Sequence, residues 1–327
     1  MLLNIHSYYS LRYGTLSIDQ IVETLIAAKF ERAVLTDINN STGVLEFIKK
    51  CSEKGIQGLA GMEFRNGDEF LYFGIARNQL GFQELNILMT ECNRDKRKLP
   101  AIAPAFNNAF VVYPFGKKKI SQLRPNEFIG VKIEQLNRIV LEPRKNYERY
   151  VIWKPVTIKN SDENHKLHKQ LRSIGRNILI SQLKEKQVAN RNETFVTKVV
   201  LLKAYKDFPE IIASTEKLLS QCSFDFNFKE IKNKQTFTGN RYDDKLLLEK
   251  YAMDGLQRRY GNKNKVARER VQEELSIIDN LNFSSYFLIT DDICRYARSR
   301  EFRYVGRGSG ANSVVAYCLG ITDVCPN

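Results

Sequence analysis

Three glycines within five positions surround a single arginine near the end of the sequence, in the run Val305–Ser313. Glycine lets the backbone approach a ligand closely, and the arginine adds a forked, permanently charged donor. An apolar run, Val314–Leu319, follows and ends at Gly320, which predicts a short helix after the turn. Because the first amides of a helix have no internal partner, the stretch is typical of a phosphate site. A nucleotide-hydrolase P-loop is excluded, because no Gly-Lys-Ser or Gly-Lys-Thr follows.

The same glycines would also suit a tight strand-to-helix turn that binds nothing. The pattern alone leaves both interpretations open, because short motifs often occur by chance. Ser309 is placed either to cap the following helix or to donate a hydrogen bond to a phosphate, and the two roles are compatible.

Histidine is scarce in this chain, which has three: His6, His165 and His168. A centre of two or three metal ions needs several carboxylate or imidazole ligands around a position left open for water. His165 and His168 lie three apart on one predicted helix face, and we expect them to be exposed or hydrogen-bonded rather than metal ligands. The small number of histidines therefore argues against a centre of two or three metal ions.

Strand and helix patterns alternate along the first hundred residues, which predicts an α/β fold of parallel strands with helices outside, as a barrel or an open sheet. Ser17 and Gln20 form a capping box, and Asn66-Gly67 is a hairpin signal. The expected strands are 2–5, 33–36, 56–64, 69–76, 109–113 and 150–153. The expected helices are 18–26, 44–54, 82–92, 162–174 and 206–222.

The composition changes near Ser223–Phe228, where polar residues without a period begin. Beyond this point, helical patterns over 243–260, 266–281 and 285–298 precede the glycine turn and the last helix. We therefore expect two domains, 1–225 and 226–327.

The chain has 327 residues, of which 43% are hydrophobic, and a formal net charge of +14. A charge this large indicates a polyanionic partner, and nucleic acid is the commonest one. No apolar run is long enough to span a membrane, and Asn4 and His6 interrupt the only apolar start, so no signal peptide is predicted. The six scattered cysteines are typical of reduced thiols, and the expected localisation is cytoplasmic.

The run from Leu275 to Pro326 resembles the start of the palm domain in the alpha-subunit family of bacterial DNA polymerase III. The resemblance is carried by Asn282–Ile289, the glycine turn and Ile321–Pro326. The palm of this family is of the polymerase-beta nucleotidyltransferase type, and its beginning should be mainly helical here. In the family, a Gly-Arg-Gly-Ser-Gly turn holds the triphosphate of the incoming nucleotide. The resemblance therefore implies triphosphate contacts at Arg307, Gly308, Ser309 and Gly310.

The first domain resembles the polymerase-and-histidinol-phosphatase (PHP) domain, a seven-stranded αβ barrel that opens these polymerases. Residues 3–10, 35–37 and 61–63 carry the resemblance. Family members with an active site bind metal ions through His, Asp and Glu for phosphoesterase or proofreading nuclease chemistry. Here only the polar residues His6, Asp37 and Glu63 remain, and no metal is expected. The other ligand positions fall on Leu2, Asn4, Tyr13, Ile38, Leu71, Val156 and Ile158.

The resemblance implies an N-terminal piece of a DNA-directed DNA polymerase that acts in chromosomal replication. The family's catalytic Asp-x-Asp pair lies beyond residue 327, so no catalytic residue is expected here and the piece alone should be inactive. Asp291 and Asp292 are adjacent, and helix neighbours point about 100° apart, so we expect surface charges. Asp323 is expected to cap or turn the chain.

For the complete protein, the resemblance implies Mg²⁺, primer-template DNA and deoxynucleoside triphosphates, with no cofactor in this piece. It also implies a proofreading exonuclease on the PHP domain, a sliding clamp elsewhere and no membrane. Two alternatives stay open. A free-standing PHP-class metal phosphoesterase predicts bound zinc, manganese or iron. A nucleic-acid-binding module without catalysis explains the charge but leaves the glycine turn without a role.

Overall fold

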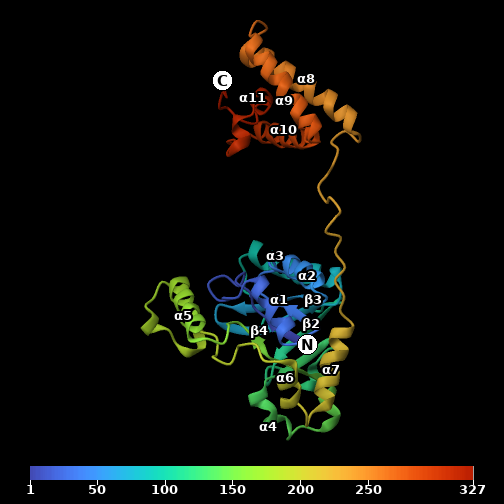
Figure 1. Ribbon diagram of the computed structural model, residues 1–327, viewed down its shortest axis with the longest axis vertical. Coiled ribbons are helices and arrows are strands. Elements are labelled where there is room, and N and C mark those ends of the chain that lie inside the picture. The colour runs from blue at the N-terminus through green and yellow to red at the C-terminus, as the bar shows by residue number, and fades with distance from the viewer. Residues whose placement is uncertain (327) are drawn as a thin grey trace. The chain divides into compact units, whose positions relative to one another are not determined.

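The computed structural model describes residues 1–326, which form two compact units. Unit 1 is Met1–Phe228, and unit 2 begins at Lys229 (Figure 1). Residues 229–235, which open unit 2, are all exposed. Among the described residues, no helix is both long enough and apolar enough to cross a membrane.

Unit 1 is built on one mixed sheet of eight strands within residues 1–326, in the order β7-β6-β5-β4-β3-β2-β1-β8. Neighbouring strands are parallel, except that β4 runs antiparallel to both β3 and β5. The strands are β1 (Leu2–Ile5), β2 (Arg32–Leu35), β3 (Gln57–Asn66), β4 (Glu69–Ala76), β5 (Ala109–Pro114), β6 (Glu127–Val131), β7 (Tyr150–Ile152) and β8 (Pro155–Val156).

The sheet curls because its two edge strands belong to one short run of chain. β7 pairs with β6, β8 pairs with β1, and two residues separate them. The amide of Trp153 extends the first pairing by donating to the carbonyl of Val131 at 2.9 Å. The amide of His6 extends the second by donating to the carbonyl of Val156 at 2.8 Å. Residues 150–156 thus act as one strand position, so the eight strands fill the seven positions of the expected barrel.

Helices surround this sheet (Figure 1). They are α1 (Ile18–Ala27), α2 (Val44–Glu53), α3 (Gln79–Arg94), α4 (Leu136–Ile139), α5 (Asp162–Arg176), α6 (Lys198–Ala204) and α7 (Pro209–Ser220). The predicted capping box is present at α1, where Ser17 and Gln20 bond to each other's backbone amides. The predicted hairpin joins β3 to β4, with Gly67 at φ 63°.

Several elements differ from the sequence expectations. The helix expected over 206–222 begins only at Pro209, because proline has no amide proton and favours the first turn of a helix. α6 precedes it as a separate short helix. β6, β8 and α4 were also not expected from the sequence. Gly130 lies within β6, and glycine disfavours a strand. A Cβ at Gly130 would lie 3.0 Å from the Cβ of Trp153, a closer approach than most side chains make, so the glycine favours tight packing here.

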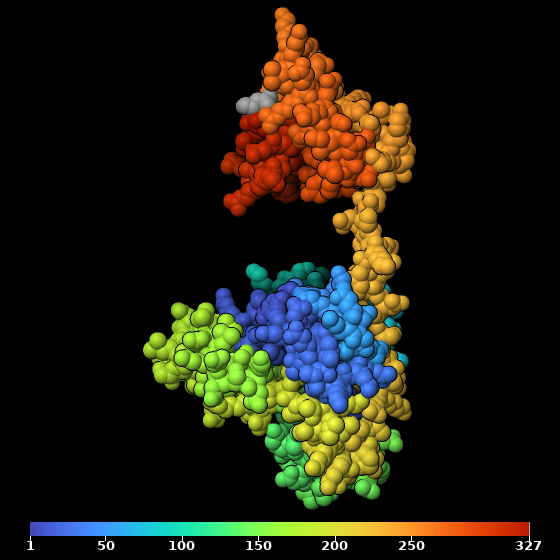
Figure 2. Space-filling view, in the orientation of Figure 1, coloured from blue at the N-terminus to red at the C-terminus, as the bar shows by residue number. Residues whose placement is uncertain are grey.

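α5 and the turns after it form a lobe at the side of the barrel, shown in yellow-green in Figure 2. Its attachment to the rest of unit 1 is polar. Arg172 and Arg176 both pair with Asp68, which lies in the β3–β4 hairpin. Five of the six cysteines are buried, and burial raises the pKa of the Cys51 and Cys222 thiols to about 12. They are packing groups, as expected.

Unit 2 is helical within the described residues, as the palm resemblance implies. Its α-helices are α8 (Arg241–Tyr260), α9 (Lys265–Asn280), α10 (Ser284–Ser299) and α11 (Val314–Leu319). A 3-10 turn, Ser309–Asn312, precedes α11. α8 and α11 pack closely at Gly255, where a Cβ would lie 2.1 Å from the carbonyl oxygen of Cys318. Only glycine permits this approach.

Candidate functional site

The glycine turn lies on the surface of unit 2, with Arg307, Gly308, Ser309 and Gly310 all exposed. Gly308 has φ 79° and ψ −165°, a conformation essentially restricted to glycine. A Cβ added at Gly308 or Gly310 would meet no atom within 4 Å, so this backbone is open to a ligand. Within residues 1–326, no backbone carbonyl accepts a hydrogen bond from the amide of Ser309 or Gly310. Two donors are therefore available beside one guanidinium group.

The first turn of α11 is already satisfied by protein groups. The hydroxyl of Ser313 accepts from the amide of Ala316 at 2.9 Å and donates to the carboxylate of Glu274. The other carboxylate oxygen of Glu274 accepts from the amide of Val314 at 2.8 Å. Ser313 rather than Ser309 is thus the helix cap, because the 3-10 turn lies between Ser309 and the helix. The open amides are those of the turn and not those of the helix start.

The C-terminal end of α11 is held by two arginines from neighbouring helices. Arg258 of α8 donates to the carbonyl of Cys318 at 2.9 Å. Arg298 of α10 donates to the carbonyl of Gly320 at 3.0 Å. Cations at this end of a helix satisfy its last carbonyls and complement its dipole. With Glu274 of α9 at the other end, three helices fix the segment that follows the turn.

Buried polar side chains gather around Glu63, which is 1% exposed, inside unit 1. One of its carboxylate oxygens accepts from Asn4 at 2.9 Å and lies 2.8 Å from Nε2 of His6. The other carboxylate oxygen pairs with Arg65. Burial alone would raise the pKa of Glu63, but interactions with Arg65 and His6 lower it to about 2. Glu63 is therefore an anion whose charge is balanced inside the protein.

The other two polar residues of the PHP pattern are also fully engaged. Nδ1 of His6 lies 2.9 Å from the hydroxyl of Thr157, so both ring nitrogens have partners. Asp37 accepts from the amide and the hydroxyl of Ser7 and from the hydroxyl of Ser10, each at 2.7 Å. Burial raises the pKa of Asp37, and these three hydrogen bonds oppose that rise.

These residues do not fit a metal centre. A histidine ligates a metal through a free ring nitrogen, and Arg65 brings a fixed positive charge to Glu63, the carboxylate that contacts His6. The Arg65 guanidinium also lies 4.6 Å from the ring centre of Tyr13. Across residues 1–326, no cluster of three His, Cys, Asp or Glu side chains is arranged to hold an ion. The residues that the resemblance aligns with further ligand positions are buried and have apolar side chains unable to bind a metal: Leu2, Leu71, Val156 and Ile158.

His168 of α5 is buried and bonded on both sides. Its Nδ1 donates to the carbonyl of Tyr13 at 2.7 Å, and its Nε2 accepts from the amide of Ala189 at 2.7 Å. Burial lowers the pKa of His168 to about 4, so the ring is neutral at ordinary pH. His165 is buried as well. The expected hydrogen bonding therefore applies to His168, and neither histidine is exposed.

Asp291 is 2% exposed, which corrects the expectation of a surface charge. It pairs with Arg295 at 2.6 Å and with Arg298 at 3.6 Å. Asp292 is exposed, so the two neighbours do lie on different faces of α10, as helix geometry requires. Asp323 is exposed and pairs with an arginine of α8 at 2.9 Å.

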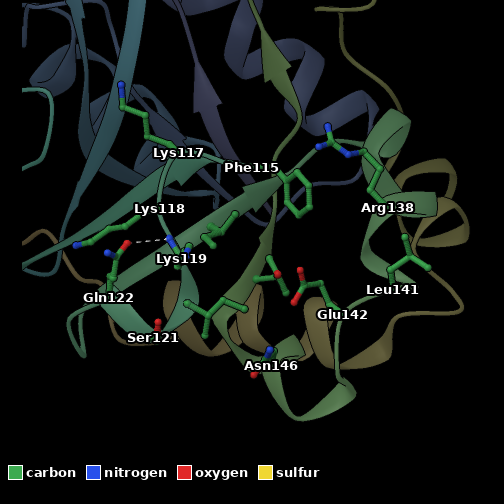
Figure 3. A pocket seen from close by; sticks show the side chains of 14 residues that line it. Phe115, Lys117, Lys118, Lys119, Ser121, Gln122, Arg138, Leu141, Glu142 and Asn146 are labelled. Carbon is green, nitrogen blue, oxygen red and sulfur yellow. Dashed lines mark hydrogen bonds between the residues drawn. The ribbon is translucent and has the colours of Figure 1, made fainter.

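A hollow of about 1000 Å³ lies in unit 1 between the loop after β5, α4 and the start of β7 (Figure 3). Lys117–Lys119 line one side of it. Lys118 is bound to the buried carboxylate of Glu127, and Arg138 stacks on Phe115 with 5.0 Å to the ring centre. Much of the positive charge here is used within the protein, so we assign no ligand to this hollow.

Two important residues were not singled out in the sequence, Arg65 and Glu274. Arg65 had a local signal, because residues two apart on a strand share a face and Arg65 follows Glu63 by two. Glu274 had none, since its partners Ser313 and Val314 lie 39 and 40 residues away in the sequence.

Two family models match the chain. The model described as PHP domain matches residues 3–284. The model described as bacterial DNA polymerase III alpha NTPase domain matches residues 246–327, which include the glycine turn. The two matches overlap across 246–284, within the helices that open unit 2.

Curated relatives align with nearly the whole chain. The DNA polymerase III subunit alpha of Halalkalibacterium halodurans is 27% identical over 99% of this chain and 32% of its own length. The corresponding subunit of Ureaplasma parvum is 28% identical over 99% of this chain and 32% of its own length. The error-prone DNA polymerase of Symbiobacterium thermophilum is 27% identical over 98% of this chain and 34% of its own length. The chain thus spans about a third of the length of these relatives.

The fold agrees with both family matches. Nearly all of the curled mixed sheet with its outer helices lies within the PHP match, and the polymerase match covers most of the four α-helices described in unit 2. The chain therefore belongs to the PHP-domain family and carries, after the barrel, the start of the alpha-subunit domain of bacterial DNA polymerase III.

Proposed function

We propose that the glycine turn binds the triphosphate of a deoxynucleoside triphosphate, and that the complete protein is a replicative DNA-directed DNA polymerase. The observation that carries this proposal is the pair of open amides at Ser309 and Gly310 beside the exposed Arg307. Preorganised amides and a guanidinium group stabilise phosphate oxygens without reorganising during the reaction. The polymerase names of the relatives support the same assignment.

In this proposal, the residues of the chain bind and orient the nucleotide. Gly308 lets the backbone turn without a side chain, and Arg307 offers a forked donor. Ser309 donates to a phosphate instead of capping α11. The contacts of Glu274 with the start of α11 keep the turn in place.

Nucleotidyl transfer also requires divalent ions, for which we propose Mg²⁺, to activate the primer hydroxyl and neutralise the leaving pyrophosphate. The family's Asp-x-Asp pair does not occur in this sequence. We therefore propose that these 327 residues bind the phosphates and cannot polymerise DNA alone.

For the barrel, we propose a structural role without a bound metal. The pairing of Glu63 with Arg65 and His6 favours this role over a free-standing metal phosphoesterase. Docking of a proofreading exonuclease on the PHP domain, and of a sliding clamp elsewhere on the complete protein, are proposals that rest on the family resemblance. We likewise keep a domain division between residues 225 and 226 as a proposal.

The substitution Arg307→Ala in the complete gene product tests the phosphate site. Loss of a charged hydrogen bond of about 1.5–3 kcal/mol should lower kcat/KM for deoxynucleoside triphosphates by about tenfold to a hundredfold. The melting temperature should stay unchanged, because the side chain is exposed. Primer extension kinetics and calorimetry measure the two effects.

Arg300→Ala is the matched control, since Arg300 is an exposed arginine of the same unit, outside the turn. It should keep normal kinetics. Unchanged kcat/KM in Arg307→Ala would contradict the assignment of the turn. An equal loss in both variants would show that general positive charge, and not the turn, is responsible.

A further inference from the structure

Five arginines line one hollow of unit 2, which has a volume of about 840 Å³. It lies between α8, α10, the segment 302–304 and the end of α11. The arginines are Arg258, Arg259, Arg295, Arg298 and Arg303. Guanidinium groups repel one another, so such a cluster requires anions either from the protein or from a ligand.

The protein supplies only part of the compensating charge. Three carboxylates line the hollow or pair with its arginines, those of Asp254, Asp291 and Asp323. Five cations against three anions leave an excess of two positive charges. Asp323 is 86% exposed, and a solvated ion pair of this kind is weak, so a phosphate can replace it. Within the described residues, no carboxylate pairs with Arg303.

Three of the guanidinium groups lie against tyrosine rings. The pairs are Arg259 over Tyr317 at 4.3 Å, Arg295 over Tyr251 at 4.2 Å and Arg298 over Tyr304 at 5.9 Å, from guanidinium carbon to ring centre. A stacked guanidinium keeps its N–H groups at the edge, where they can donate to phosphate oxygens. Stacking also reduces the conformational entropy that binding would otherwise cost.

The rim of the hollow combines Arg303 with exposed aromatic rings. Phe302 is 63% exposed and Tyr304 is 37% exposed, and Arg303 lies between them in the sequence. Positive grooves with exposed aromatic rings are typical of single-strand binding, because every base can stack on a ring while the arginines follow the phosphates. A duplex offers no unstacked base for such rings.

We propose that this arginine-lined hollow binds the phosphates of a single-stranded DNA segment, with the bases stacked on Phe302 and Tyr304. This site is separate from the glycine turn and does not depend on the triphosphate assignment. It assigns part of the net charge of +14 to one binding site.

The test uses the 327-residue chain and a fluorescent oligothymidylate, with anisotropy read across a salt series. Phe302→Ala and Arg303→Ala are the informative variants, because both side chains are exposed and neither supports α11. Arg303→Ala should weaken binding about fivefold at low salt and reduce the slope of log K against log salt by about 0.7. Phe302→Ala should weaken binding by about fivefold or more with an unchanged slope.

Arg300→Ala is again the control, because Arg300 lies over Tyr296 on the same helix end but outside the hollow. Wild-type affinity in Arg303→Ala, or an equal loss in Arg300→Ala, would overturn the site. Equal weakening of duplex binding in Phe302→Ala would overturn the single-strand assignment. A loss of oligonucleotide binding in Arg307→Ala as large as the loss in Arg303→Ala would show one shared site and overturn the separation from the glycine turn.

Discussion

The barrel interior and the glycine turn use similar polar groups in opposite ways. In the barrel, His6, Asp37 and Glu63 are at most 1% exposed, and each is bonded to the protein. At the turn, Arg307 and the backbone around it are exposed, and the amides of Ser309 and Gly310 have no backbone acceptor within the described residues. The polar groups of the barrel interior bond to one another and stabilise the fold. The polar groups of the glycine turn stay available to a ligand.

An arginine in each region shows what the difference means. Arg65 is held between Glu63 and Tyr13, and the interaction with Glu63 raises the pKa of Arg65 despite burial, which opposes it. Its charge therefore stabilises the fold. Arg307 is exposed, so its charge can serve a ligand. The same residue type is structural in one place and functional in the other because of its surroundings.

The largest effect should come from breaking the balance inside the barrel. Glu63→Ala removes the anion that Arg65 and His6 face, and an uncompensated buried charge costs about 3–5 kcal/mol of unfolding free energy. Denaturant titration of the 327-residue chain measures it. Glu69→Ala is the control, since Glu69 is an exposed glutamate in the next strand, and it should cost far less.

The pH dependence of stability tests the same ion-pair network in the barrel. The pKa of Glu63 is lowered from 4.5 to about 2 in the folded protein, so its contribution is present above pH 4.5 and is lost as pH falls toward 2. Glu63→Gln should weaken this acid dependence. A Glu63→Ala variant as stable as the wild type would contradict the assignment of the barrel as a structural ion-pair network.

A smaller effect is expected where the glycine turn meets α11. Glu274→Ala removes the acceptor of the Ser313 hydroxyl and the Val314 amide, which should cost about 1–3 kcal/mol locally. Hydrogen exchange of the α11 amides should accelerate, and KM for nucleotide in the complete protein should rise more than kcat falls. Glu274→Gln should restore most of both. Glu273→Ala, at an exposed neighbour, should change neither; equal effects in the two alanine variants would show that Glu274 does not position the turn.

Local patterns predicted much of the fold. The capping box at Ser17 and the hairpin at Asn66-Gly67 depend on neighbouring residues, and both are present. β6 was not predicted. Gly130 disfavours a strand locally, and it packs against Trp153, which is distant in the sequence. Patterns also could not show that β7 and β8 share one strand position, since that depends on where β1 and β6 lie.

The candidate site divides in the same way. The turn residues from Arg307 to Gly310 were identified from composition and family resemblance, and their assignment stays a prediction. Glu274 and the burial of Asp291 depend on how helices far apart in sequence pack together. The start of α11 looked open to an anion in the sequence, and only the fold shows that a carboxylate of the protein is already there.

The most direct test is a titration of the isotope-labelled chain with inorganic triphosphate, followed by amide NMR. Saturable shifts are expected at Ser309 and Gly310, with the amides of His6 and Glu63 unchanged. Silent signals at 309–310 up to millimolar triphosphate, or first shifts inside the barrel, would contradict the assignment of the turn.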